Sequence, residues 1–254
     1  AATDLDGQYF FDIFTTDGFV GDRLLVNHAW QPYMEVLPRK YRMRLIDGSM
    51  SRFIQLCLAD QNGNFVPFQF IANDGNFVVN PITLTQLDEQ GTAERYDIVV
   101  DFSRFRPGDK VYVVNLLQQT DGRKPDGALS LARALAKDSP DTAVGPVMEF
   151  RIVTEVESVD VPGHIHRASD PDPSRVPLTL TEQIPIVAPV RERHVTFGRG
   201  NGDSRDPLTG QCNPDCSETA TSFPWILKIN GEAAHSMNAN RVSVLIPKPG
   251  EVEH

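Results

Sequence analysis

Short runs in which apolar and polar residues alternate recur along the chain. In residues 41–46, large apolar side chains alternate with basic ones, and residues 52–56 resume the alternation after a turn at residues 47–49. A shorter apolar run lies upstream at residues 24–26. Strict alternation predicts half-buried strands, with one face on a core and the other in water. This stretch therefore predicts β-structure.

The pattern continues with a hairpin signal and a fully buried strand. Residues 64–79 hold two alternating runs around Asp74-Gly75. Such a pair between strand-forming residues is a strong short-range signal for a hairpin. The side chains of residues 98–100 are all apolar, which predicts a strand buried on both faces, and Arg95 can pair with Asp97 at its start.

Other segments complete the first part of the chain. Four more strands are expected at residues 8–14, 81–87, 110–117 and 147–153. Residues 118–144 contain several turn residues and one short helical pattern within residues 128–137. We interpret residues 118–144 as an insertion loop between two strands.

The last third of the chain differs in composition. Residues 155–177 are rich in Pro and Asp, which is typical of an extended linker. Strand patterns return in residues 191–197, 223–230 and 241–246, with a long polar loop between the first two. We therefore expect an all-β chain that extends beyond a single domain.

Composition limits the classes of function. A chain of 254 residues is long enough for two small domains, and 19 Pro and 18 Gly provide the turns of an all-β protein. The formal net charge of −10 argues against a nucleic-acid partner, because phosphate binding requires clustered Lys and Arg. No apolar run approaches the roughly 20 residues of a membrane span, so no membrane partner is expected.

One stretch, residues 21–56, resembles the middle-domain signature of the laccase-like multicopper oxidases. This group includes spore-coat laccase, bilirubin oxidase and phenoxazinone synthase. The residues that keep the pattern are Gly21, Asp22, Val26, Asn27, Pro32, Tyr33, Glu35, Val36, Pro38, Arg39, Tyr41, Arg42, Arg44, Leu45 and Ser49.

Further segments support the same resemblance. Residues 93–102, AERYDIVVDF, match the family nearly letter for letter, and residues 147–153 resemble its closing strand. In the last third, Trp225, the Asn230-Gly231 pair and Pro247 are similar to the opening of the family's last domain. Several separate matches in the right order make chance similarity an unsatisfactory explanation.

The resemblance implies a cupredoxin-like Greek-key β-sandwich. Residues 1–153 would form the middle domain, residues 154–188 a linker and residues 189–254 the N-terminal part of the last domain, truncated before its copper-ligand motifs. By the same resemblance, the remaining cupredoxin domains would belong to the same enzyme or to a second chain. We expect this polypeptide to be a piece of a longer one, or one with trimmed ends.

The resemblance also implies the chemistry of the whole enzyme. Members of the family oxidise phenols, small aromatics or metal ions at one copper ion and reduce dioxygen to water at a trinuclear copper cluster. A Cys flanked by two His residues, H-C-H, and the run H-P-x-H-x-H supply ligands to these centres. This chain has neither motif and contains only six His residues. We therefore expect a copper-ligand-free scaffold, inactive alone and without catalytic or cofactor-binding residues, from a secreted, periplasmic or spore- or cell-surface enzyme.

Three His residues are the remaining metal candidates. His164 and His166 have the H-x-H form, but they lie in the expected linker instead of a strand of the first or last domain. His254 aligns with a position that is not a ligand in the family. His28 replaces the family's turn glycine and is expected to be exposed. None of these positions predicts a copper centre of the family.

The three cysteines and the basic strand receive structural interpretations. Cys212 and Cys216 could form a disulfide, bind a metal or remain as two free thiols, and an extracytoplasmic location favours the disulfide. Cys57 lies in an alternating apolar run and is expected to be a buried structural thiol. Arg42 and Arg44 are expected on a solvated or interdomain strand face.

Two other classes of function remain open from the sequence. One is a non-enzymatic scaffold or interaction protein with a cupredoxin-like sandwich. The other is one subunit of a split oxidase whose second chain supplies the copper ligands. A copurifying chain that contains H-C-H would distinguish the split oxidase from the scaffold.

Overall fold

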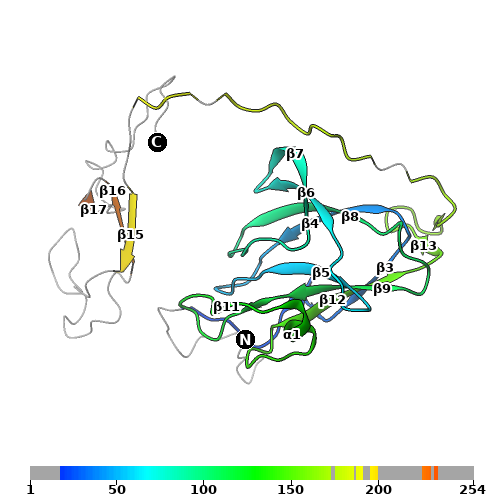
Figure 1. Ribbon diagram of the computed structural model, residues 1–254, viewed down its shortest axis with the longest axis horizontal. Coiled ribbons are helices and arrows are strands. Elements are labelled where there is room, and N and C mark those ends of the chain that lie inside the picture. Colours follow the sequence, from blue (N-terminus) through cyan, green and yellow to red (C-terminus); the bar gives the residue numbers. More distant parts are fainter. Residues whose placement is uncertain are drawn as a thin grey trace. The chain divides into compact units, whose positions relative to one another are not determined.

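A computed structural model describes residues 18–172, 175–185, 187–190, 195–199, 225–229 and 232–233. The chain divides into two units: the larger comprises Asp17–Gln183, and the other comprises Ala1–Thr16 and Ile184–His254. The larger unit contains two four-stranded sheets, drawn in Figure 1. The described residues of the other unit are few and are treated separately below.

The two sheets of the larger unit form a β-sandwich. One sheet has the order β3-β12-β9-β5 and the other the order β4-β8-β6-β7. The strands of the first are β3 (Tyr33–Val36), β12 (Gly145–Ile152), β9 (Lys110–Asn115) and β5 (Leu56–Asp60). Those of the second are β4 (Lys40–Ile46), β8 (Arg95–Asp101), β6 (Phe68–Asn73) and β7 (Asn76–Leu84). All neighbours are antiparallel except β3 and β12, which pair in parallel.

A hydrophobic core fills the space between the sheets. Its fully buried members come from both sheets: Val36, Leu58, Phe68, Tyr96, Ile98, Val100, Val111, Phe150 and Ile152. Phe102 joins them just after β8, and its ring lies 5.3 Å from that of Phe150. The buried residues Ile98, Val99 and Val100 confirm the prediction that this strand is buried on both faces.

A second apolar cluster covers the outer face of the first sheet. Here α1 (Leu131–Leu135) packs against β9 and β12, and its buried residues Leu131 and Ala134 join Cys57 and Val114. Figure 1 shows α1 on the side of this sheet that faces away from the other sheet. The expected short helix is therefore present, and the insertion that carries it is part of a core.

Two hairpins have turns with positive φ angles. Strands β1 (Leu25–Val26) and β2 (Ala29–Trp30) are joined by Asn27 and His28, whose φ angles are 50° and 67°. Positive φ at both central residues is the type I′ geometry that matches strand twist. The predicted hairpin at Asp74-Gly75 is confirmed, since these residues connect β6 to β7 with φ of 47° and 88°.

The segment expected to be a linker begins with a hairpin. Strands β13 (Glu155–Glu157) and β14 (Ile165–Arg167) pair antiparallel. The side chain of Arg39 donates a hydrogen bond to the Arg167 carbonyl at 3.4 Å, and Lys40 pairs with Asp172. These contacts connect the hairpin to the beginning of β4. Further along, the Leu180 amide donates to the Val79 carbonyl at 2.8 Å.

Three expectations for the larger unit were wrong in detail. Residues 81–84 belong to β7, so residues 81–87 do not form a separate strand. Residues 52–55 form no regular strand, for a reason given with the site below. Asp97 pairs with Arg42 and Arg44 of the neighbouring strand β4, whereas Arg95 pairs with Asp74. Cross-strand side chains on one sheet face are closer than residues that are two apart along one strand.

A two-stranded and a three-stranded sheet complete the described elements. In the larger unit, β10 (Leu117–Gln118) pairs with β11 (Gly127–Ala128) within the insertion. In the other unit, β15 (Val195–Arg199), β16 (Trp225–Ile229) and β17 (Glu232–Ala233) form a three-stranded antiparallel sheet. These strands overlap the expected strands at residues 191–197 and 223–230. The strands expected at residues 8–14 and 241–246 lie outside the described residues.

Candidate functional site

Only two of the metal candidates lie in the described part of the chain. His166 lies on β14 and His164 immediately precedes this strand. The centroids of their rings are 4.6 Å apart. Within the described residues, no group of three or more His, Cys, Asp or Glu side chains could hold a metal ion. His254, Cys212 and Cys216 lie outside the described residues. The structure therefore brings together one His pair and does not test the disulfide.

The residues interpreted as structural lie where the pattern placed them. Cys57 on β5 is 1% exposed, and burial raises the pKa of its thiol to about 12. His28 is exposed in its turn. Arg42 and Arg44 are exposed on β4, and both make ion pairs with Asp97. Cys57 is thus confirmed as a buried thiol that remains protonated at neutral pH.

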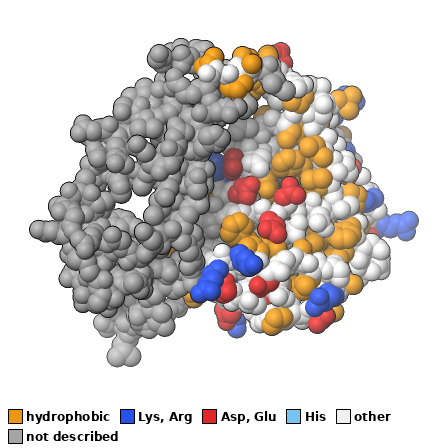
Figure 2. Space-filling view, turned by 60° about the vertical axis from the view of Figure 1, so that its left-hand side comes forward, with side chains coloured by type: hydrophobic (Ala, Val, Ile, Leu, Met, Phe, Trp, Pro, Cys, Tyr) orange, Lys and Arg blue, Asp and Glu red, His pale blue; other side chains and the backbone are white. Residues whose placement is uncertain are grey.

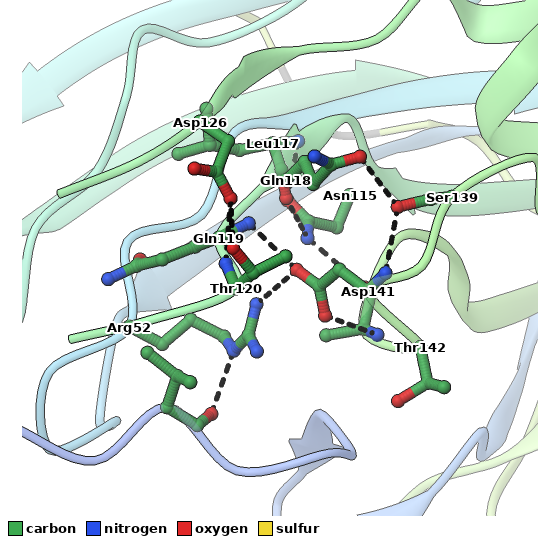
Figure 3. A network of polar contacts seen from close by, with 12 residues as sticks. Arg52, Asn115, Leu117, Gln118, Gln119, Thr120, Asp126, Ser139, Asp141 and Thr142 are labelled. Atoms are coloured by element: carbon green, nitrogen blue, oxygen red, sulfur yellow. Dashed lines mark hydrogen bonds and ion pairs between the residues drawn. The ribbon is translucent and has the colours of Figure 1, made fainter.

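The most extensive buried polar arrangement is centred on Arg52, which is 2% exposed. Its Nη1 donates to Asp141 Oδ2 at 2.7 Å. Its Nε donates to the Val20 carbonyl at 2.8 Å and its Nη2 to the Gly21 carbonyl at 3.0 Å. Figure 3 shows Arg52 and Asp141 facing each other within this network. Arg52 thus fixes residues 20–21 against the insertion.

Asp141 supplies the negative charge that compensates for the burial of the Arg52 guanidinium. Besides Arg52, its carboxylate accepts the Gln119 amide at 2.8 Å and the Ala143 amide at 3.0 Å. A buried charge is stable only when it is paired and its remaining hydrogen bonds are satisfied. The pair therefore has a structural role, and its hydrogen bonds leave no group placed to act on a substrate.

Side-chain acceptors explain why residues 52–55 are not a strand. The Phe53 amide donates to Gln119 Oε1 at 2.7 Å, and the Gln55 amide donates to Asn115 Oδ1 at 3.0 Å. The Ile54 amide donates to the Gln90 carbonyl at 3.0 Å. These backbone groups are satisfied without a neighbouring strand, which meets the requirement that buried amides be paired.

Sequence reasoning missed this network because its partners are far apart in the chain. Arg52 and Asp141 are separated by 89 residues, and a lone Arg in an alternating run predicts a solvated face. Asp47 was also missed as a buried carboxyl. Burial raises its pKa, opposed by the hydrogen bonds from Ser49, and its Oδ2 has no hydrogen-bond partner among the described residues. The pattern at residues 47–49 predicted that Asp47 lies in a turn, but it did not predict that the Asp47 side chain is buried.

Several exposed apolar side chains lie at one edge of the first sheet. The β1–β2 hairpin and the strand β3 that follows it expose Leu25, Trp30, Tyr33 and Met34, each by 42% or more. The guanidinium of Arg151 lies 3.6 Å from the ring centroid of Tyr33. Figure 2 shows one face of the molecule, on which apolar patches lie among charges of both signs. Exposed apolar side chains in successive elements are typical of surfaces that contact another protein.

Comparisons with known proteins identify the relatives of this chain. No protein-family model matches it. It is 38% identical to a laccase of Bacillus subtilis (strain 168) over 97 residues, which are 38% of this chain and 18% of the relative. It is 34% identical to a bilirubin oxidase of Albifimbria verrucaria over 148 residues, which are 53% of this chain and 26% of the relative.

A solved structure supports the fold. The McoA multicopper oxidase 2F4 variant of the hyperthermophile Aquifex aeolicus matches 91% of this chain and 39% of its own, with a TM-score of 0.57 and 24% identity. The sandwich has the fold of the multicopper oxidases. The similarity to a laccase and a bilirubin oxidase supports a place for the chain among the laccase-like multicopper oxidases. It spans well under half of the length of each of these relatives.

The described residues include no helix that is long and apolar enough to cross a membrane.

Proposed function

We propose that this chain is the copper-ligand-free framework of a laccase-like multicopper oxidase. In this proposal, the larger unit is the middle domain, and the other unit contributes to the last domain. Other domains of the same enzyme, or a second chain, supply the copper ligands. The complete enzyme oxidises a phenolic, small aromatic or metal-ion reductant and reduces dioxygen to water. Its location is secreted, periplasmic or at the cell surface by family resemblance alone.

The observation that carries the proposal is the family signature in residues 21–56 and 93–102 of a sequence that contains neither H-C-H nor H-P-x-H-x-H. Every described strand of the larger unit's two sheets contributes to a core built from apolar side chains, and no three potential ligands converge among the described residues. A mononuclear copper centre of this family requires a Cys thiolate together with imidazoles. The one described cysteine, Cys57, is enclosed between β5 and α1 with no ligand cluster around it.

The exposed edge of the sandwich supports the framework role. Leu25, Trp30, Tyr33 and Met34 are apolar side chains that a second domain would remove from water. Charged pairs such as Arg151 with Glu149 flank this edge on β12. An apolar centre with a charged rim is typical of the interfaces between domains.

Oxygen consumption tests the proposal. The purified chain is incubated with Cu²⁺ and a phenolic reductant such as 2,6-dimethoxyphenol, and dissolved oxygen is recorded. We expect no turnover above that of free Cu²⁺, because electron transfer to dioxygen requires centres that this chain does not provide. Catalytic oxygen uptake by the chain at its calculated mass, verified by intact-mass measurement and without a copurifying protein, would contradict the proposal.

A further inference from the structure

The β13–β14 hairpin carries an imidazole pair that the family's copper centres do not account for. His166 lies on β14 opposite Val156, and the Ser158 amide donates to the His164 carbonyl at 2.8 Å, which extends the strand pairing to His164. Residues two apart on a strand project from the same face. Both imidazoles therefore lie on one side of the hairpin.

The distance between the rings fits a shared metal ion. Their centroids are 4.6 Å apart and their planes are inclined by 81°. With an N–metal bond of about 2.0–2.1 Å and a centroid about 1.1 Å behind the nitrogen, two imidazoles at cis positions of one ion have centroids about 4.5–5.1 Å apart. The pair already has this spacing, and rotation about the broad Cβ–Cγ torsion aims the nitrogens.

We propose that His164 and His166 form an exposed two-imidazole site for a divalent transition-metal ion, with Cu²⁺ as the preferred ion. Neutral imidazole suits copper, nickel and zinc, and Cu²⁺ binds most tightly in the series of first-row divalent metals. Mg²⁺ and Ca²⁺ prefer oxygen ligands to imidazole. The inference stands on the hairpin and does not depend on the proposed function.

The two carboxylates of β13 are directed elsewhere. Glu155 lies opposite Arg167 and makes an ion pair with it at 3.0 Å. Glu157 lies opposite Ile165, and its Oε1 accepts the Gly163 amide at 2.8 Å. By strand alternation, both residues lie on the face that does not carry the imidazoles. Water therefore completes the coordination, which keeps the ion exchangeable.

Local hydrogen bonds hold the two histidines in place without a metal. The His164 amide donates to the Val161 carbonyl at 3.0 Å, and the Val161 amide donates to Ser158 Oγ at 3.2 Å. These bonds close the loop between the strands. A pre-organised pair loses less conformational entropy when the ion binds than two independent side chains would lose.

Titration with Cu²⁺ tests the site. Isothermal titration calorimetry gives the affinity, and paramagnetic broadening of backbone amide NMR signals gives the location. At the lowest Cu²⁺ concentrations, we expect broadening confined to the β13–β14 hairpin. We expect His164→Gln and His166→Gln each to weaken binding by about tenfold or more, equivalent to about 1.4 kcal/mol. Zn²⁺ binds more weakly, and Mg²⁺ does not bind.

The control removes a different exposed histidine. His28→Gln alters the β1–β2 turn and should leave the Cu²⁺ affinity and the broadened signals unchanged. Both hairpin positions are on the surface, and amide NMR spectra recorded without metal verify that the fold is retained. Unchanged Cu²⁺ affinity in the His164→Gln, His166→Gln double variant would overturn the inference. So would initial broadening outside the hairpin.

Discussion

At the scale of single residues, burial separates side chains that the sequence pattern treats as equivalent. Arg42 and Arg52 both occur in alternating runs, but Arg42 is exposed and Arg52 is 2% exposed. The difference arises from Asp141, which is remote in sequence and supplies the opposing charge. Burial of Arg52 therefore depends on Asp141.

Replacement of Asp141 by Asn should strongly destabilise the larger unit. Asn retains the size of Asp but leaves the Arg52 guanidinium buried without its counter-charge, which costs about 3–5 kcal/mol. Urea denaturation, followed by tryptophan fluorescence and circular dichroism, measures the free energy of unfolding. Asp138→Asn is the matched control, because Asp138 pairs with Arg133 at the exposed surface and should matter little. Equal stability of the two variants would contradict the role assigned to Arg52.

Replacement of His28 by Gly should stabilise the protein. His28 has a φ of 67°, a conformation in which a residue with a Cβ atom is strained by about 1–2 kcal/mol and glycine is not. Part of this gain is offset by the greater freedom of glycine in the unfolded chain, so we expect a gain of about 1 kcal/mol in the free energy of unfolding. His28→Ala retains the strain and should give no gain. Stabilisation by Ala as large as that by Gly would show that loss of the imidazole, and not backbone strain, is responsible.

At the scale of elements, local patterns predicted the strands well and their partners poorly. The alternation in residues 41–46 and the Asp74-Gly75 signal specify β4 and the β6–β7 hairpin, because period and turn chemistry are local properties. The short strand β3 was missed, since three of its four residues are exposed and no alternation marks it. Its parallel pairing with β12 involves residues more than 110 positions apart, which no local pattern encodes.

The insertion between β9 and β12 is a folded element of the core. Leu131 on α1 is 7% exposed and packs in the cluster with Cys57 and Val114. Leu131→Ala should lower the free energy of unfolding by about 2–5 kcal/mol, as the removal of a buried leucine side chain commonly does. Arg133→Ala, on the same helix at an exposed position, controls for changes in helix propensity. If Leu131→Ala is no more destabilising than this control, α1 does not contribute to the core.

The charged cluster between β9 and β12 should make stability depend on acid pH. The hydrogen bond from Arg151 lowers the pKa of Glu149, opposed by burial and assisted by Lys110. A carboxyl whose folded pKa lies below its unfolded value adds stability above the ordinary glutamate pKa of 4.5. This contribution is lost as pH falls through the lowered pKa of the folded state.

Glu149→Gln isolates this contribution. We expect the variant to be less stable than the parent at pH 7, with the difference shrinking as pH falls below 4.5 and through the lowered pKa. Urea denaturation at a series of pH values measures it. Glu89→Gln, at an exposed position, should show a smaller effect. A difference between Glu149→Gln and the parent that stays constant with pH would rule out the ionised Glu149 as its source.

At the scale of the whole molecule, the sequence predicted the family and the sandwich correctly. Matches in residues 21–56 and 93–102 include strand β3 of the first sheet and strands β4 and β8 of the second. The imidazole pair is a different case. The H-x-H pattern was visible at His164 and His166, but a linker was expected there, and the strand that orients both rings depends on pairing with β13. The pairing of β13 with β14 places the motif in a hairpin instead of an extended linker.

The central claim is that this chain provides the framework of an oxidase without holding its redox copper. Copper content and visible absorption, measured after loading with Cu²⁺ and dialysis against a chelator, test it most directly. An exchangeable imidazole site loses its ion under these conditions and, without a thiolate ligand, gives no intense blue band. We predict negligible residual copper and no blue absorption. Near-stoichiometric copper that survives the chelator, together with a blue absorption band, would contradict the account.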